Sequence, residues 1–75
     1  MSQEATRYGR ETCRRTITVQ TPDRGKATVI VTRRSTGAGA RIWITFDGAI
    51  KTTAVFTETE AAHLGELIDT AREKR

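Results

Sequence analysis

The sequence predicts an α+β fold: a four-stranded antiparallel β-meander followed by one C-terminal amphipathic helix that packs on one face of the sheet. Three observations support this prediction. Short segments rich in β-branched residues alternate between apolar and polar side chains and are separated by turn motifs. Asp47-Gly48 is a strong hairpin motif. A helix-capping motif at Thr57 precedes apolar residues at helical spacing.

The N-terminal part of the chain changes character near residue 13. Residues 1–12 have no apolar periodicity and are interpreted as a flexible N-terminal arm, which leaves residues 13–75 as a single β-β-β-β-α domain. The first strand is expected over Arg14–Gln20, with Ile17 and Val19 on one face. A chain of 75 residues allows only one small domain, whose stability is marginal unless it associates with itself.

Two turns flank the second strand, which is expected over Lys26–Arg34. In the first turn, proline fixes φ, Asp23 can bond its own backbone and Gly25 can adopt a positive φ. The second connection, Ser35–Gly39, contains two glycines and is expected to be a flexible loop.

The register of the last hairpin follows from keeping one face apolar. The third and fourth strands are expected over Ala40–Phe46 and Ile50–Phe56. A two-residue Asp-Gly loop would place Lys51 on the apolar face, whereas a loop extended by Ala49, or a bulge there, pairs Phe46 with Ile50. We therefore expect a loop with an odd number of residues.

The C-terminal helix begins with a capping box in which Thr57 caps the first turn and Glu60 reaches back. Its apolar residues share one face, which is expected to cover the apolar side of the sheet. The helix residues are Ala61, Leu64, Leu67, Ile68 and Ala71, and the sheet residues are Ile17, Val19, Val29, Val31, Ile42, Ile44, Phe46, Ile50, Ala54 and Phe56.

Residues that could carry catalysis are scarce. The only histidine, His63, has no serine or cysteine placed near it, and the helix carboxylates are typical of a solvated face. We therefore expect no enzyme, no cofactor and no metal. The unpaired Cys13 suits a reducing compartment, and no apolar run approaches the length of a membrane span. A cytoplasmic protein without a membrane partner is expected.

The sheet face opposite the helix suggests a binding function. It combines threonine hydroxyls, the only tryptophan and several cations, and residues 1–34 carry net charge +5 against −1 for residues 35–75. An aromatic residue surrounded by cations is typical of single-strand recognition. We expect a small, non-enzymatic, dimeric nucleic-acid-binding regulator, directed at single strands or backbones, with DNA and RNA both open. Trp43 would stack on bases, and the phosphate-neutralising residues would be Arg14, Arg15, Arg33, Arg34, Arg41 and Lys51.

A second class of function fits the same residues. Trp43, Ile30 and Val55 could instead form a sheet-on-sheet dimer interface or contact a protein partner. The chain would then be a homodimeric protein–protein interaction module, such as a phage- or plasmid-type accessory protein that binds a host partner. Gly65 either admits the backbone of a second helix or is simply tolerated. The residues expected in a helix-mediated dimer are Leu64, Gly65 and Ile68.

The order of elements resembles the single-strand-binding domain of the positive-cofactor-type transcriptional coactivators. The similarity covers residues 14–72 and includes the Gly25-Lys26 start of the second strand and the Thr-capped helix after the last strand. That resemblance implies a curved sheet that binds single-stranded DNA and a C-terminal helix that forms a dimer.

Residues 42–75 also resemble the oligomerisation half of actinobacterial nucleoid-associated silencers. The similarity consists of Phe46-Asp47-Gly48, the following strand, the Thr57 cap, and a helix with Ala61, Leu64 and a basic end. The segment between Asp-Gly and the cap is one residue longer here, and the Arg-Gly-Arg element of those proteins is not found. This resemblance therefore implies self-association and not DNA reading.

Overall fold

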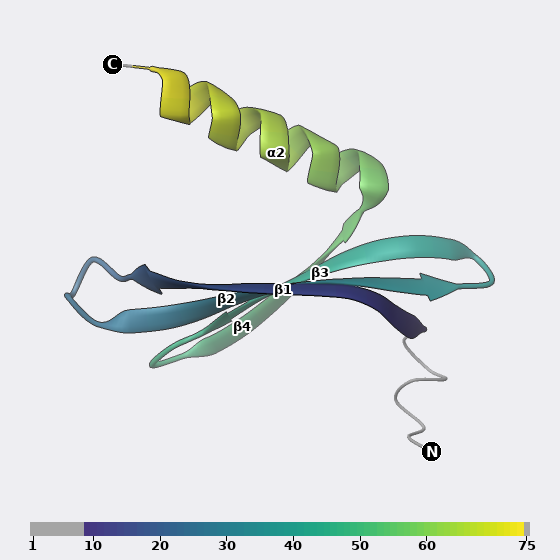
Figure 1. The fold of residues 1–75 in the computed structure, drawn as a ribbon, viewed down its shortest axis with the longest axis horizontal. Helices are drawn as coiled ribbons and strands as arrows, with labels where there is room; N and C mark the ends of the chain where they lie inside the picture. Colours follow the sequence, from purple (N-terminus) through teal and green to yellow (C-terminus); the bar gives the residue numbers. More distant parts are fainter. Residues whose placement is uncertain (1–8, 75) are drawn as a thin grey trace.

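The computed structural model describes residues 9–74. Four antiparallel strands form one sheet in the order β1-β2-β3-β4, and a single helix follows the last strand (Figure 1). This arrangement confirms the predicted α+β fold class. The elements are β1 (Arg10–Gln20), β2 (Lys26–Thr36), β3 (Gly39–Asp47), β4 (Lys51–Thr57) and α2 (Glu58–Glu73).

The first strand begins earlier than the sequence indicated. β1 starts at Arg10, so residues 10–12, expected in the flexible arm, are part of the sheet. The register shifts between Glu11 and Cys13, which makes Thr12 an extra residue in a bulge. This bulge interrupts the alternation that would have marked a strand. The rest of the expected arm, residues 1–8, lies outside the described residues.

In the turn between β1 and β2, Arg24 has the positive φ of 68°, where Gly25 was expected to have it. Gly25 instead lies in a tightly packed position, where a Cβ atom would be 3.0 Å from the Thr21 hydroxyl oxygen. The Asp23 carboxylate accepts hydrogen bonds from the Thr21 hydroxyl and from the Gly25 amide, the latter at 3.2 Å. The expected role of Asp23 in the turn is thus confirmed.

The connection between β2 and β3 is a tight turn and not the expected flexible loop. Thr36 pairs with Gly39, which leaves only Gly37 and Ala38 between the strands. The Thr36 hydroxyl donates to the Gly39 carbonyl oxygen and accepts from the Ala38 amide, both at 3.1 Å. These side-chain hydrogen bonds let β2 and β3 continue to the turn.

The last hairpin has the expected odd loop but a different register. Asp47 pairs with Lys51, so the loop contains residues 48–50, and Phe46 pairs with Thr52 and not with Ile50. A Cβ atom at Gly48 would lie 3.1 Å from the Ala27 side chain, so this loop folds closely against β2. The apolar side chains keep their common face, but Ile50 lies in the loop and is 80% exposed.

The capping box at the start of α2 is confirmed. The Glu60 amide donates to the Thr57 hydroxyl at 3.1 Å, and the Thr57 amide donates to the Glu60 carboxylate at 2.9 Å. Glu58 and Glu60 lie in the first turn and Arg72 lies in the last, which suits the helix dipole.

Strand pairing assigns each side chain to one of two faces, because directly paired residues point to the same side of a sheet. The helix-side face carries the ion pair between Arg33 and Glu58 of α2. As predicted, Ile42 and Ile44 lie on the helix side and Trp43 lies on the other. The helix-side face comprises Cys13, Arg15, Ile17, Val19, Ala27, Val29, Val31, Arg33, Ile42, Ile44, Phe46, Thr52, Ala54 and Phe56. The opposite face, called the Trp43 face, comprises Glu11, Arg14, Thr16, Thr18, Thr28, Ile30, Thr32, Arg34, Arg41, Trp43, Thr45, Asp47, Lys51, Thr53 and Val55.

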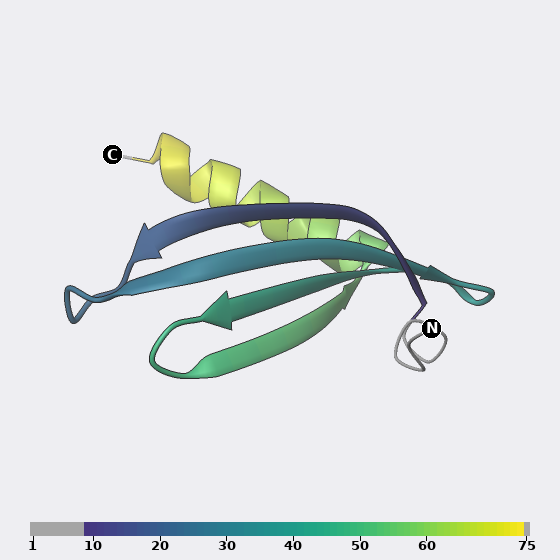
Figure 2. The ribbon, with the colours of Figure 1, turned by 60° about the horizontal axis from the view of Figure 1, so that its bottom comes forward.

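The expected core lies on the helix side but is not closed. Among the strands, α2 contacts β3 and β4, and Figures 1 and 2 place it on one side of the sheet. Of the described apolar side chains, only Ala27 is buried, whereas Ile17 is 62% exposed and Phe46 is 49% exposed. The helix therefore covers only part of the apolar face.

Candidate functional site

The candidate site lies at the centre of the Trp43 face. Trp43 of β3 is half-buried between Thr32 of β2 and Val55 of β4, its partners in the strand pairing. Thr32 is buried, with 6% of its surface exposed. Trp43 and Thr32 line a shallow depression of about 280 Å³, whose lining residues are Arg14, Ile30, Thr32, Arg34, Trp43, Thr45, Lys51 and Thr53.

The depression combines a hydroxyl-rich floor with basic side chains. The hydroxyl oxygens of Thr45 and Thr53 lie 3.0 Å apart across β3 and β4 and share a hydrogen bond. Arg14 and Arg34 line the depression from β1 and β2, and Lys51 lines it from the start of β4. Such a surface offers positive charge, neutral hydrogen-bonding groups and one aromatic ring within a single recess.

Arg34 and Trp43 form a cation–π pair. The guanidinium carbon of Arg34 lies 5.5 Å from the centroid of the Trp43 ring, within the range of this interaction. Arg34 pairs across the strands with Arg41, so two guanidinium groups are anchored side by side on this face. A planar guanidinium next to an indole can stack on a flat ligand as well as bind an anion.

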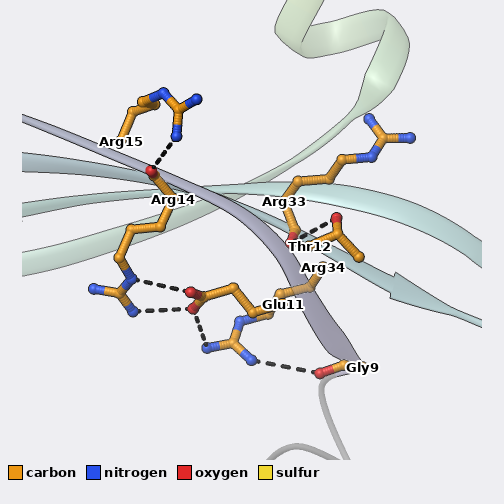
Figure 3. A network of polar contacts seen from close by, with 7 residues as sticks. All are labelled: Gly9, Glu11, Thr12, Arg14, Arg15, Arg33 and Arg34. Carbon is orange, nitrogen blue, oxygen red and sulfur yellow. Dashed lines mark hydrogen bonds and ion pairs between the residues drawn. The ribbon is translucent and has the colours of Figure 1, made fainter.

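Glu11 organises the arginines at one end of the depression (Figure 3). Its carboxylate accepts two hydrogen bonds from Arg14, at 3.0 and 3.1 Å, and forms an ion pair with Arg34 at 3.8 Å. The hydrogen bond from Arg14 lowers the pKa of Glu11 and raises the pKa of Arg14. The sequence reasoning missed Glu11 because it assigned residues 1–12 to an arm.

The structure places four of the six predicted phosphate ligands on the Trp43 face and two on the other face. Arg15 and Arg33 lie on the helix side, where Arg15 donates to the Arg14 carbonyl oxygen at 2.9 Å and Arg33 pairs with Glu58. Figure 3 shows their side chains on the opposite side of the sheet from Arg14 and Glu11. Side chains at consecutive positions of a strand point to opposite faces, so neighbouring arginines do not share one. The six predicted phosphate ligands therefore do not form one surface, and phosphate binding by each of them stays a prediction. The four that share the face are Arg14, Arg34, Arg41 and Lys51.

The residues predicted for a dimer lie on α2. Leu64 is half-buried and lines a small hollow together with residues 54–56 of β4. Ile68 is 57% exposed. A Cβ atom at Gly65 would have no other atom of the chain within 4 Å, apart from its own neighbourhood in the helix. The glycine is therefore not required by packing within one chain, and its role in a dimer stays a prediction.

Other chemistry has little support among residues 9–74. No group of three or more histidine, cysteine, aspartate or glutamate side chains there could hold a metal ion. His63 lies beside Glu60, Leu64 and Leu67, and Cys13 is exposed. No helix in this part of the chain is long and apolar enough to cross a membrane.

Comparison of the chain with models of known protein families, with curated proteins and with solved structures gives no match. The two resemblances described above therefore stay predictions.

Proposed function

We propose that this protein binds nucleic acid through the Trp43 face and does so without catalysing a reaction. The observation that carries this proposal is the recess in which Trp43 and Arg34 are surrounded by Arg14, Lys51 and threonine hydroxyls. Base stacking on an aromatic ring and phosphate neutralisation by cations are the two contacts that single strands need.

The position of the cations favours a single strand of nucleic acid that runs parallel to the β-strands of the sheet. Arg34 and Arg41 form one pair near the Gly37-Ala38 turn, and Lys51 lies near the opposite end of β3. On β2, Arg34 lies at the level of Arg41 and Thr28 lies at the level of Lys51. These two positions are six residues apart, which corresponds to about 20 Å. Trp43 lies between them, so a bound nucleic-acid strand would meet two arginines, an aromatic ring and then Lys51, which pairs across the strands with Asp47.

Backbone contacts are favoured over base-specific contacts. Threonine hydroxyls can donate to phosphate and sugar oxygens as readily as to bases, and arginine and lysine contacts to phosphate carry no sequence information. Four cations contacting a single strand give a slope of log affinity against log salt of about −3. Affinity should then fall roughly 50-fold between about 50 and 200 mM salt.

Neighbouring arginines provide a matched test. Arg14 and Arg15 are adjacent on β1 but lie on opposite faces. Fluorescence anisotropy with a labelled oligonucleotide, measured across a salt series, should show that Arg14→Ala weakens binding and reduces the salt slope by about one unit. Arg15→Ala should leave the slope unchanged.

Two results would contradict the proposal. Equal effects of the two substitutions would mean that the Trp43 face is not the binding surface. Absence of binding at low salt, with both DNA and RNA oligonucleotides, would rule out nucleic acid as the ligand. The recess would then belong to the competing function, contact with a protein partner.

A further inference from the structure

Among residues 9–74, no element covers the β1–β2 half of the helix-side face. A helix is about 10 Å wide and strands lie about 4.8 Å apart, so one helix covers about two strands. α2 contacts β3 and β4, and the apolar side chains on β1 and β2 stay open. Ile17 of β1 is 62% exposed and Val31 of β2 is 36% exposed. An apolar hollow of about 610 Å³ lies at the turn end of this face and is lined by Val19, Ala27 and Phe46, among others.

The apolar side of α2 is also only partly used. Ala61 and Leu64 are half-buried, whereas Leu67 is 55% exposed and Ile68 is 57% exposed. Large side chains on the apolar stripe of a helix are normally buried, because the stripe is what attaches a helix to a core. The sheet and the helix therefore each present apolar surface toward a missing partner.

Charge indicates that these two surfaces fit each other. On the helix-side face described above, β1 and β2 carry the basic residues Arg15 and Arg33 and no acidic residue, whereas α2 carries five acidic and one basic side chain. The ion pair between Arg33 and Glu58 already joins this hairpin to the helix within one chain. A second α2 would bring net negative charge onto the positive half of the helix-side face.

We infer that the partner is a second copy of this chain, with the α2 helix of each copy lying on the β1–β2 half of the other's helix-side face. The contact is reciprocal and closes as a two-fold dimer. The helix of 16 residues is about 24 Å long and about 10 Å wide, so it covers about 240 Å² of the sheet. Two such contacts, each counted on the helix and on the sheet, bury roughly 1,000 Å². That area meets the lower bound of a specific interface, and both Trp43 faces stay outside it. Residues 1–8 offer only Met1, Ala5 and Tyr8 as apolar cover.

Complementary variants test this arrangement. In a reciprocal dimer, Ile17→Lys changes the sheet surface and Ile68→Glu changes the helix surface, so each variant alone damages both contacts. Each should raise the dimer dissociation constant at least about tenfold in sedimentation equilibrium. An equimolar mixture of the two should form a heterodimer of about twice the 8.3 kDa chain mass, because one contact is wild-type and the other joins opposite charges.

Matched controls lie on the opposite face of the same sheet. Thr18→Lys is next to Ile17 on β1 but points to the Trp43 face, so it should leave the dimer unchanged, as should Trp43→Ala. If a single variant unfolds because folding requires the dimer, far-ultraviolet circular dichroism replaces mass as the readout. The mixture should then regain the folded signal.

Three outcomes would overturn the inference. A wild-type chain that stays at 8.3 kDa at high micromolar concentration would show that a second copy does not cover the face. A wild-type dimer whose two variants do not rescue each other would show a different interface. Loss of the dimer with Trp43→Ala would identify sheet-on-sheet association. Because no nucleic acid is present in the assay, its failure is distinguishable from failure of the proposed function.

Discussion

Replacement of Trp43 by alanine separates a surface role of this side chain from a core role. Trp43 is half-buried on the face away from α2, where the indole ring interacts with Thr32, Val55 and Arg34. Two cross-strand pairs contribute about 0.2–1 kcal/mol each, and an exposed cation–π pair contributes about 0.5–1 kcal/mol. The substitution should therefore lower the free energy of unfolding by about 1–3 kcal/mol, whereas loss of a buried aromatic would cost about 3–5 kcal/mol.

The same variant should also lose affinity for nucleic acid. Removal of a stacking residue costs about 1–3 kcal/mol per base, or roughly 5- to 150-fold in affinity. Urea denaturation measures the first quantity and oligonucleotide anisotropy measures the second, at a concentration where the variant is folded. Phe46→Ala is the control, because it removes a ring from the same strand on the helix-side face. An unfolded Trp43→Ala protein, or unchanged affinity for the oligonucleotide, would refute the reasoning.

Three further changes test separate parts of the structure. Glu11→Gln removes the carboxylate that pairs with Arg14 and Arg34, so oligonucleotide affinity should rise a few-fold and its salt slope should steepen; weaker binding would mean that Glu11 is needed to position the arginines. The pKa of Asp23 is held below 3.8, first by the hydrogen bond from the Thr21 hydroxyl and then by that from the Gly25 amide. The ionised Asp23 should therefore stabilise the fold above that pH, and this stabilisation should be lost as pH falls through the lower pKa of the folded state. The urea midpoint measured through this acid range should depend less on pH in Asp23→Asn than in wild type. Gly65→Ala adds a methyl group that, outside its own neighbourhood in α2, has no described atom within 4 Å, and it should stabilise the fold by about 1 kcal/mol in denaturation. Weaker self-association of this variant would instead place a partner backbone at this position.

Local patterns in the sequence determined most of the fold. Alternation with a period of two placed Ile42 and Ile44 on the helix side and Trp43 on the other. The capping box located the start of α2, because both of its hydrogen bonds lie within four consecutive residues. These features depend on near neighbours in the chain, which is why the sequence alone was sufficient for them.

Features that depend on distant contacts were harder to predict. The register of β4 is accompanied by close packing of Gly48 against Ala27 on another strand. The bulge at Thr12 concealed the strand that carries Glu11. The open helix-side face depends on how far α2 reaches over the sheet, which no local pattern encodes.

Strand alternation also accounts for the face on which each predicted phosphate ligand lies. Arg14, Arg34, Arg41 and Lys51 lie on the same face as Trp43. Arg15 and Arg33 lie on the helix-side face, because side chains at consecutive positions of a strand point to opposite faces. Phosphate binding by these residues depends on a ligand and stays a prediction.

The central claim, that the Trp43 face binds nucleic acid, is tested most directly by nuclear magnetic resonance. An isotope-labelled sample is titrated at low salt with a short single-stranded oligonucleotide of mixed sequence. The predicted shifts occur at the Trp43 indole N–H and at the amides of Thr32, Thr45 and Thr53, while Ile17 and the residues of α2 stay unchanged. Shifts confined to the helix-side face, or no shifts at any oligonucleotide concentration, would contradict the claim.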